Sequence, residues 1–348
     1  MKNDKFYKPS WISAAVLQNP CYRNGVLQKG AIILNQVDPV LDLYPKLSDI
    51  FFIVERHGWF GVNEATRADL MLVEDLSCWE LVARQSPNSI LLDVGPSDFV
   101  DQDAFIPSPE IETTYDVIQV SCWSRRKRIE LFIEAAARMP ELSFVHMGHF
   151  ENNGSNEELE YKRECLEYAK NYATNIYFPY ENVDDNDGLN HSKTVMNQWV
   201  NRARIGVLTT QSEGINRFKM ECLAANRPCL VPNDVATPTR KHIEPSTGVF
   251  YTPTVDDLME SIKGTLDRIE EFRPREYVLN VTGKANTLPK LRRALNELAA
   301  KRGQVAGFDA VSWDGRNASL AWGEEAVDLI EENLAQHAHG KPQVVEAY

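Results

Sequence analysis

Apolar and polar positions alternate on two scales along this chain. Short apolar runs have the length and composition of buried strands, and the longer amphipathic segments between them have helical spacing. In the first third, the expected strands are residues 11–18, 49–55, 68–73 and 89–95, and the expected helices are residues 24–36 and 76–85. Strands that alternate with helices are typical of βα units. The pattern therefore predicts an α/β domain with a parallel sheet.

A second series of the same kind follows an irregular segment at residues 106–114, which holds two prolines and has no periodicity. Its expected strands are residues 115–122, 142–149, 175–180, 205–210 and 229–233, and its expected helices are residues 128–139, 156–173, 194–203 and 255–269. The remaining tail is more helical and ends in an amphipathic stretch at residues 319–336. Two α/β domains joined by a short linker predict a ligand-binding cleft between them.

Composition and charge narrow the functional classes. The 348 residues are 43% hydrophobic and 25% charged, as in a soluble globular protein, and no apolar run approaches the ~20 residues that cross a bilayer. The N-terminus lacks the apolar core of a secretory signal, and the six cysteines are scattered without zinc-site spacing, so a cytoplasmic protein is expected. A net charge of −13 argues against broad binding to nucleic acid or to an anionic membrane.

The stretch QSEGINRFKMECLAANRPCLVPND, residues 211–234, carries the first candidate chemistry. It follows an apolar, β-branched run, and its residues Ile215, Phe218 and Cys222 have helical spacing. A strand, a tight turn and a helix are therefore expected. Backbone N–H groups at the start of such a helix, at the carboxyl edge of a sheet, form a site for an anion such as a diphosphate.

Two glutamates lie in this stretch, Glu213 in the turn and Glu221 a little over two helical turns further on. A carboxylate accepts two hydroxyl hydrogen bonds, which suits the vicinal hydroxyls of a ribose or a hexose. Alternatively, Glu221 is a solvated helix residue and Glu213 is a favourable charge near the helix N-terminus. The spacing alone leaves both interpretations open.

The order of segments resembles family-4-type retaining glycosyltransferases of group 1. Those enzymes have the two-domain GT-B fold and carry a Glu, seven intervening residues and a second Glu, as do SEG and ECLAANRP here. The similarity covers roughly residues 68–335 and is strongest over residues 116–250, with residues 319–334 similar to the closing helix. The resemblance implies an acceptor-binding Rossmann-like domain at residues 1–110, a nucleotide-sugar-binding domain at 111–310, and a helical segment at 311–348 that packs back on the first domain.

The resemblance also implies roles for residues of this stretch. Glu221 would bind the nucleotide ribose, Glu213 the donor sugar, and the backbone of Gly214, Ile215 and Asn216 would approach the donor. Asn216 stands where the family usually has glycine, which puts the identity of the donor sugar in doubt. Asn226 is a second position of this kind.

A basic cluster, SRRKR, follows the expected strand at residues 115–122. Positive charge at a helix start opposes the helix dipole at a cost of ~0.3–1 kcal/mol per residue, so a bound anion would explain the cluster, and a solvated basic patch is the alternative. The family holds the donor diphosphate with an Arg and, five residues later, a Lys. Lys127 matches the lysine, whereas Cys122 occupies the arginine position, and Arg125 or Arg126 would have to replace the missing charge.

Three weaker motifs complete the set. His57, in IVERHGWFG, resembles the family's histidine beside the donor sugar, although a structural histidine at a strand end is equally consistent. Asn24 and Gly25 would form the turn of the family's first loop. The triplet at residues 185–187 resembles metal-nucleotide motifs of another fold but is better explained as a solvated loop, and the GT-B resemblance implies no required metal or other cofactor.

The sequence therefore predicts a metal-independent enzyme that transfers a sugar from a nucleoside-diphosphate-sugar donor to an unidentified hydroxyl acceptor, with retention. His57, Lys127 and Glu213 are the expected catalytic residues. The expected donor-binding residues are Arg125, Arg126, Gly214, Ile215, Asn216 and Glu221. A non-catalytic relative that binds a nucleotide or supports a partner enzyme remains an alternative, as does an enzyme that modifies nucleic acid. No P-loop, nucleophile elbow or dinucleotide fingerprint is present.

Overall fold

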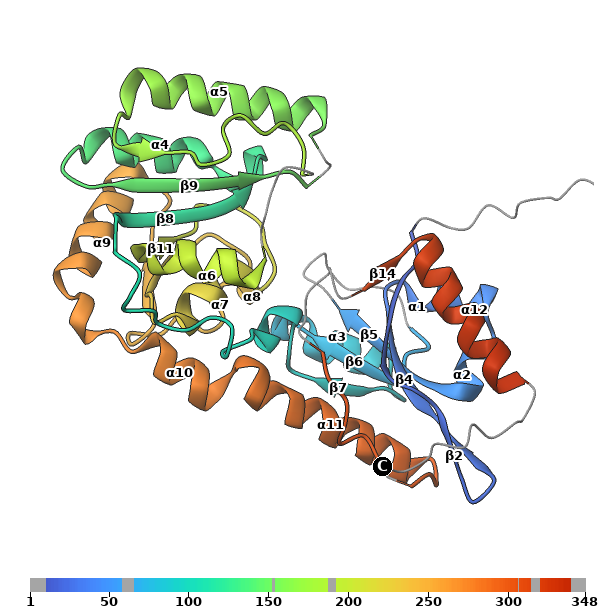
Figure 1. Cartoon of the computed structure of the whole chain (residues 1–348). Coiled ribbons are helices and arrows are strands. Elements are labelled where there is room, and N and C mark those ends of the chain that lie inside the picture. Colours follow the sequence, from blue (N-terminus) through green and yellow to red (C-terminus); the bar gives the residue numbers. More distant parts are fainter. Residues whose placement is uncertain are drawn as a thin grey trace, which may run out of the picture. The chain divides into compact units, whose positions relative to one another are not determined.

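The computed structural model describes residues 11–57, 66–151, 154–186, 192–305, 307–313 and 320–338 (Figure 1). The chain divides into two compact units. Unit 1 comprises Met1–Phe99 and Asn286–Tyr348, and unit 2 comprises Val100–Ala285. Within the described residues, no helix combines the length and the apolar character needed to cross a bilayer.

Unit 1 is built on a mixed sheet with the strand order β14-β1-β4-β5-β6-β7 among the described residues (Figure 1). Its strands are β1 (Ser13–Gln18), β4 (Gly30–Leu34), β5 (Phe51–His57), β6 (Leu70–Val73), β7 (Ile90–Leu92) and β14 (Ala321–Trp322). Strands β4 to β7 are parallel, whereas β1 is antiparallel to both of its neighbours. The expected strands of the first third are thus present, and their parallel part is the βα series that the sequence predicted.

The helices of unit 1 lie on both faces of this sheet. They are α1 (Val37–Leu43), α2 (Leu47–Ile50), α3 (Trp79–Gln85), α11 (Gly283–Lys301) and α12 (Glu324–Ala338), with 3₁₀ turns η1 (Leu76–Cys78) and η2 (Pro96–Phe99). Leucines of α11 pack in one hydrophobic cluster, and α12 packs in the other. This packing explains why the boundary between the units falls inside α11, at residue 285, and not near residue 310 as expected from the sequence.

Residues 24–36 do not form the expected helix. The strands β2 (Cys21–Arg23) and β3 (Val26–Gln28) form a hairpin, and β4 follows it. Residues 24–36 thus contain the hairpin turn, β3 and β4. Asn24 and Gly25 occupy the turn with φ of 51° and 76°. A two-residue turn with positive φ at both positions matches the twist of the paired strands, and Asn-Gly is its preferred sequence. The five consecutive buried residues of β4 belong to a strand covered on both faces, which helical spacing had masked.

Unit 2 has an all-parallel sheet in the order β10-β9-β8-β11-β12-β13 among the described residues (Figure 1). The strands are β8 (Tyr115–Cys122), β9 (Phe144–His149), β10 (Ile176–Tyr177), β11 (Ala203–Val207), β12 (Cys229–Pro232) and β13 (Gly248–Tyr251). Counted along the chain, this is the doubly wound order 3-2-1-4-5-6. The order reverses between β8 and β11, and ligands of such sheets bind beyond the carboxyl ends of the strands at that reversal.

Helices cover both faces of the second sheet. They are α4 (Ile129–Arg138), α5 (Asn156–Tyr172), α6 (Lys193–Asn201), α7 (Arg217–Ala224), α8 (Thr237–Arg240), α9 (Val255–Asp267) and α10 (Pro274–Val281), with 3₁₀ turns η3 (Arg125–Lys127) and η4 (Ile269–Glu271). One hydrophobic cluster lies under α4, α5 and α9, and the other under α6, α7 and α10 (Figure 1). The expected helices and strands of this series are confirmed, and β13 and α10 are additions that their short patterns did not reveal.

Candidate functional site

The candidate site lies where the chain leaves β8 and β11, the two strands at the reversal point of the unit 2 sheet. After β8, Trp123 is 1% exposed and packs over Gly148 of β9, where even a Cβ atom would overlap the indole ring. The chain then turns through η3 into α4. The backbone N–H of Gln211, beyond β11, donates to the carbonyl oxygen of Arg126 at 2.7 Å. The two loops are thereby joined at the position where a ligand is expected.

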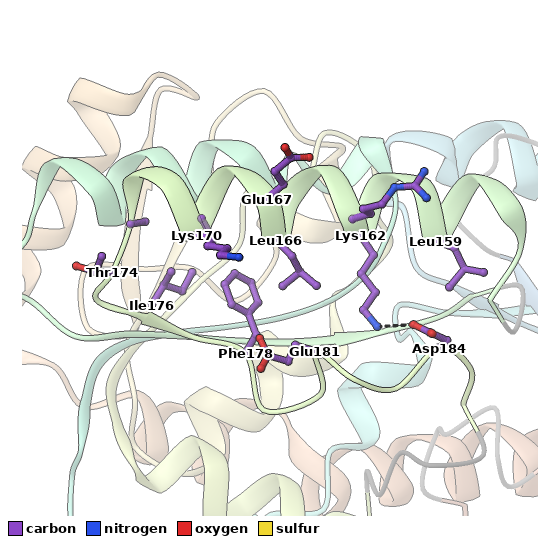
Figure 2. Close-up of a pocket in the computed structure, with 13 residues that line it drawn as sticks. Leu159, Lys162, Leu166, Glu167, Lys170, Thr174, Ile176, Phe178, Glu181 and Asp184 are labelled. Atoms are coloured by element: carbon purple, nitrogen blue, oxygen red, sulfur yellow. Dashed lines mark hydrogen bonds and ion pairs between the residues drawn. The ribbon is translucent and has the colours of Figure 1, made fainter.

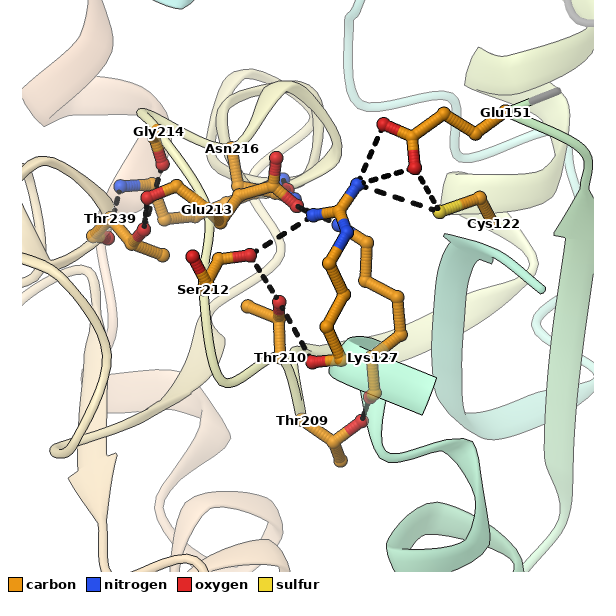
Figure 3. Close-up of polar contacts among 12 residues, drawn as sticks. Cys122, Lys127, Glu151, Thr209, Thr210, Ser212, Glu213, Gly214, Asn216 and Thr239 are labelled. Atoms are coloured by element: carbon orange, nitrogen blue, oxygen red, sulfur yellow. Dashed lines mark hydrogen bonds and ion pairs between the residues drawn. The ribbon is translucent and has the colours of Figure 1, made fainter. Parts of the chain in front are cut away.

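Lys127 and Glu213 form an ion pair at the centre of the site (Figure 3). Lys127 is 6% exposed, and burial lowers the pKa of its ammonium group to about 8. The hydroxyl of Thr209 donates to the carbonyl oxygen of Lys127 and accepts from Nε2 of Gln119 at 2.6 Å. Side chains of the sheet therefore hold the lysine backbone in place, and two residues predicted to be catalytic are brought together.

Arg126 is the second cation of the site. Its Nη2 atom lies 2.7 Å from both carboxylate oxygens of Glu151 and 3.9 Å from Sγ of Cys122. Its Nη1 atom donates to the carbonyl oxygen of Ser212 at 3.1 Å and lies 4.0 Å from Oε2 of Glu213. Burial acts to raise the pKa of Glu151, but Arg126 outweighs it and holds that pKa below its usual value. Burial raises the pKa of the Cys122 thiol, which is therefore neutral.

Arg125, which the sequence analysis placed among the donor-binding residues, lies outside this cluster. Both oxygens of the Glu164 carboxylate on α5 accept from its Nη2 atom, at 2.9 and 2.8 Å. Its guanidinium group also lies over the ring of Tyr161, 5.1 Å from the centroid. The Arg125 side chain is 58% exposed. It binds the outer helix of unit 2 and does not face the ends of the strands.

Arg128 is a structural residue of the same loop. Its backbone has φ of 49°, and its guanidinium group donates to the carbonyl oxygens of Thr209 and Thr210 at 2.6 and 2.9 Å. It also forms a two-pronged ion pair with Asp234 beyond β12, at 2.8 and 2.9 Å. Arg128 thus ties the loops after β8, β11 and β12 to one another.

Side-chain hydrogen bonds fix the backbone of the turn between β11 and α7. The Thr239 hydroxyl on α8 lies 2.7 and 2.8 Å from the carbonyl oxygens of Glu213 and Gly214 (Figure 3). The fully buried Lys219 donates to the carbonyl oxygen of Thr239 at 2.8 Å. The side chain of Asn216 caps α7 by accepting from the backbone N–H of Lys219 at 2.9 Å. This cap gives a structural reason for asparagine at a position where the resemblance led us to expect glycine.

The other predicted residues are placed as follows. Ile215 is 5% exposed and its side chain belongs to a hydrophobic cluster, so that side chain is not available to a ligand. Glu221 lies on α7 and is 7% exposed, so it is not the solvated helix residue of the alternative interpretation. His57 is the last residue of β5, and its side chain lies outside the described part of the chain.

The triplet at residues 185–187 lies partly outside the described residues. Its Asn186 accepts from the backbone N–H of Phe150 at 3.0 Å and donates to that residue's carbonyl oxygen at 2.7 Å. Asp184, just before the triplet, pairs with Lys162. Among the described residues, no group of three or more His, Cys, Asp or Glu side chains is arranged to hold a metal ion.

A separate groove of about 890 Å³ runs along α5 (Figure 2). Apolar side chains, including Leu166 and Phe178, form its floor, and none of the predicted site residues lines it. Lys162, whose side chain is 4% exposed, donates there to Asp184 at 2.9 Å and to the carbonyl oxygen of Val183. The groove is therefore distinct from the cluster around Lys127.

Solved structures with a similar fold were found, and those described below have low sequence identity to this chain. Sucrose-phosphate synthase from Thermosynechococcus elongatus superposes with a TM-score of 0.56 and 16% identity over 74% of this chain and 71% of that one. Anabaena HepE, solved with UDP and glucose, has a TM-score of 0.59 and 13% identity over 74% of this chain and 75% of that one. A glycosyltransferase from Rickettsia africae has a TM-score of 0.56 and 13% identity over 77% of this chain and 76% of that one. These neighbours are GT-B glycosyltransferases.

The chain has the GT-B fold. The Rossmann-like architecture expected from the sequence is thereby confirmed, with an all-parallel sheet in unit 2 and a mainly parallel one in unit 1. No family model matches the sequence, and no curated protein matches it either. In GT-B terms, the cluster around Lys127 and Glu213 lies at the carboxyl ends of the strands of the second Rossmann-like sheet.

Proposed function

We propose that this chain is a glycosyltransferase that moves a sugar from a nucleoside-diphosphate donor to a hydroxyl acceptor. The observation that carries the proposal is the Lys127–Glu213 pair, with Arg126 beside it, at the reversal point of the parallel sheet. Cations at that point are suited to a diphosphate, and a carboxylate among them is suited to sugar hydroxyls. Structures of HepE with UDP and with UDP-glucose give the fold-level precedent.

In the proposed reaction, the bond between the anomeric carbon and the diphosphate oxygen breaks, and its electron pair leaves with the diphosphate. Lys127 and Arg126 stabilise the negative charge that grows on that oxygen, which is the part of catalysis that fixed cations accomplish best. The acceptor oxygen bonds to the anomeric carbon on the face that the diphosphate leaves, and its proton passes to the diphosphate. Retention of configuration follows from attack on that face.

Glu213 is proposed to orient the donor sugar, and Glu221 to bind the nucleotide ribose. Thr239 and Asn216 support these roles indirectly, because they hold the backbone of the turn from Glu213 to the start of α7. A cytoplasmic location, the independence from metal and the role of His57 stay predictions from the sequence.

The proposal is tested by thermal unfolding of the whole chain with UDP, GDP, ADP, CDP and dTDP and with their sugars. A ligand at about one hundred times its dissociation constant stabilises the folded state by ~2.7 kcal/mol, which raises the melting temperature measurably. We expect the melting temperature of the wild type to rise with the nucleotides of one base. The same nucleotides should raise the melting temperature of Glu221→Ala much less. Glu164→Gln, on the outer helix, is the control that should keep the full shift.

Turnover separates the enzyme from a non-catalytic binding protein. Hydrolysis of the donor that binds, or its transfer to simple alcohols and sugars, is followed by release of the nucleoside diphosphate. A chain that shifts with none of the nucleotides contradicts the proposal, and one that binds a donor without any turnover is a binding protein.

A further inference from the structure

The Arg126 side chain is held by groups from the ends of three different strands. Glu151 follows β9, Cys122 ends β8 and Ser212 follows β11, and each contacts the guanidinium group. These three strands are adjacent in the sheet, so the guanidinium group bridges their carboxyl ends. An arginine side chain on the surface would otherwise sample many rotamers, and these contacts limit that freedom.

The hydrogen-bonding pattern leaves one face of Arg126 for a ligand. Glu151 takes only Nη2, whereas Nη1 donates to the Ser212 carbonyl oxygen and lies 4.0 Å from Oε2 of Glu213. That separation exceeds hydrogen-bond distance, and an Nη group carries two hydrogens. The Arg126 side chain is 27% exposed, so solvent and ligands reach it. The Ser212 contact uses one Nη1 hydrogen, which leaves the second for a ligand that enters beside Glu213.

We propose that Glu151 is a positioning residue that fixes the Arg126 guanidinium group beside Lys127, where Arg126 binds the diphosphate of the donor. The inference rests on the proposed function and extends it to a residue that no sequence motif indicated. The small side chain of Cys122 at the end of β8 leaves the space that the guanidinium group occupies, 3.9 Å from the sulfur. Cys122 stands where the family has an arginine, and Arg126 in η3, four residues later, thus supplies the positive charge in its place.

Charge balance supports this division of roles. In the described structure, Arg126 and Lys127 face Glu151 and Glu213, so two positive charges meet two negative ones. The Glu151 side chain is 53% exposed and lies on the side of Arg126 that also contacts Cys122, whereas Glu213 lies on the Lys127 side. A diphosphate that enters between Arg126 and Lys127 approaches the Glu213 side and leaves the Glu151 contact in place.

A double-mutant cycle on the whole chain tests the inference. Dissociation constants for UDP, GDP, ADP, CDP and dTDP are measured by calorimetry for the wild type, Arg126→Ala, Glu151→Ala, Glu151→Gln and the Arg126→Ala/Glu151→Ala double variant. We expect Arg126→Ala to weaken the diphosphate that binds best by about tenfold or more, and Glu151→Ala by about three- to tenfold. Glu151→Gln keeps one acceptor oxygen and should recover part of the loss.

The decisive readout is non-additivity. If Glu151 acts only through Arg126, its removal has no further effect once Arg126 is alanine, and the double variant binds like Arg126→Ala. Glu164→Gln is the matched control, because Glu164 makes the same kind of two-pronged contact with the neighbouring Arg125. It should bind the nucleotide like the wild type.

The possible failures are distinguishable. A wild type that binds none of the diphosphates overturns the proposed function together with this inference. A wild type that binds one of them, with Arg126→Ala unchanged, overturns the inference alone. Additive losses in the double variant would show that Glu151 acts independently. Tighter binding by Glu151→Ala and Glu151→Gln would show that Glu151 competes with the diphosphate, which also overturns the positioning role.

Discussion

Arg125 and Arg126 are adjacent in one turn of 3₁₀ helix, yet their guanidinium groups serve different parts of unit 2. Arg125 pairs with Glu164 on the outer helix and is 58% exposed, whereas Arg126 crosses the ends of the strands and is 27% exposed. Lys127, the next residue, is buried. With three residues per turn, consecutive side chains of a 3₁₀ helix point about 120° apart. A run of basic residues in the sequence is thus not a basic cluster in space.

Among substitutions in this basic run, the largest loss of activity is expected for Lys127→Ala. It removes the buried cation that we propose to face the reacting phosphate, so kcat/KM for sugar transfer should fall at least ~100-fold, the usual loss for a group that stabilises transition-state charge. Steady-state kinetics with the donor identified by thermal unfolding would measure it. Activity within about threefold of the wild type, in a variant that keeps its melting temperature, would contradict the assignment, because a cation that stabilises transition-state charge cannot be removed without a large loss of rate.

The pH dependence of binding is expected to separate Lys127 from Arg126. Burial lowers the pKa of Lys127 from 10.5 to about 8, so the unliganded site loses this charge as the pH rises through 8. Diphosphate affinity should then fall with pH, by up to about tenfold per unit above pH 8. Calorimetry from pH 7 to 9.5 measures the slope. Lys127→Arg should flatten it, because guanidinium stays protonated throughout this range; a steep slope in that variant would assign the titration to another group.

The same shift has a consequence for stability with the opposite sign. Between about pH 8 and 10.5, the unfolded chain binds more protons at this residue than the folded chain does. The contribution of Lys127 to the free energy of unfolding therefore rises with pH in that window and is lost as the pH falls through it. Binding and stability thus respond in opposite directions to the same proton.

The smallest effect is expected for Arg125→Ala. Exposed ion pairs contribute little to stability because solvent screens them, so the midpoint of urea unfolding should hardly move, and nucleotide affinity should stay within about twofold of the wild type. Urea unfolding measures the change in stability, and calorimetry measures the nucleotide affinity. A tenfold loss of affinity would break the comparison, because it would return Arg125 to the donor site that the sequence suggested.

The sequence was most informative where one strong pattern decided the structure. In unit 2, the apolar run at residues 115–122 and the amphipathic segment at 156–173 identified a buried strand and a helix. The basic cluster after that strand and the turn at SEG, together with the family resemblance, then indicated Lys127 and Glu213. Side-chain direction was inaccessible, because spacing does not tell which of Arg125 and Arg126 faces the strand ends. Glu151 was missed for the same reason, although its place just after a strand next to β8 was a usable signal.

In unit 1, the sequence was less informative because two periodicities competed. The Asn24–Gly25 dipeptide between apolar residues is the strongest local signal for a hairpin, but the surrounding spacing also fits a helix. Pairing with strands outside the segment decided between them, since β4 lies between β1 and β5 in the sheet. The periodicity within residues 24–36 does not record that pairing.

The division of the chain inside α11 sets an order for folding during synthesis on the ribosome. Unit 2 is one continuous segment, Val100–Ala285, and all of its strands have emerged before α11 is made. Unit 1 emerges first but remains incomplete, because leucines of α11 and residues of α12 fill its two hydrophobic clusters. The N-terminal part of unit 1 therefore completes its core only after α11 and α12 have been made, and its apolar surfaces stay available to chaperones until then.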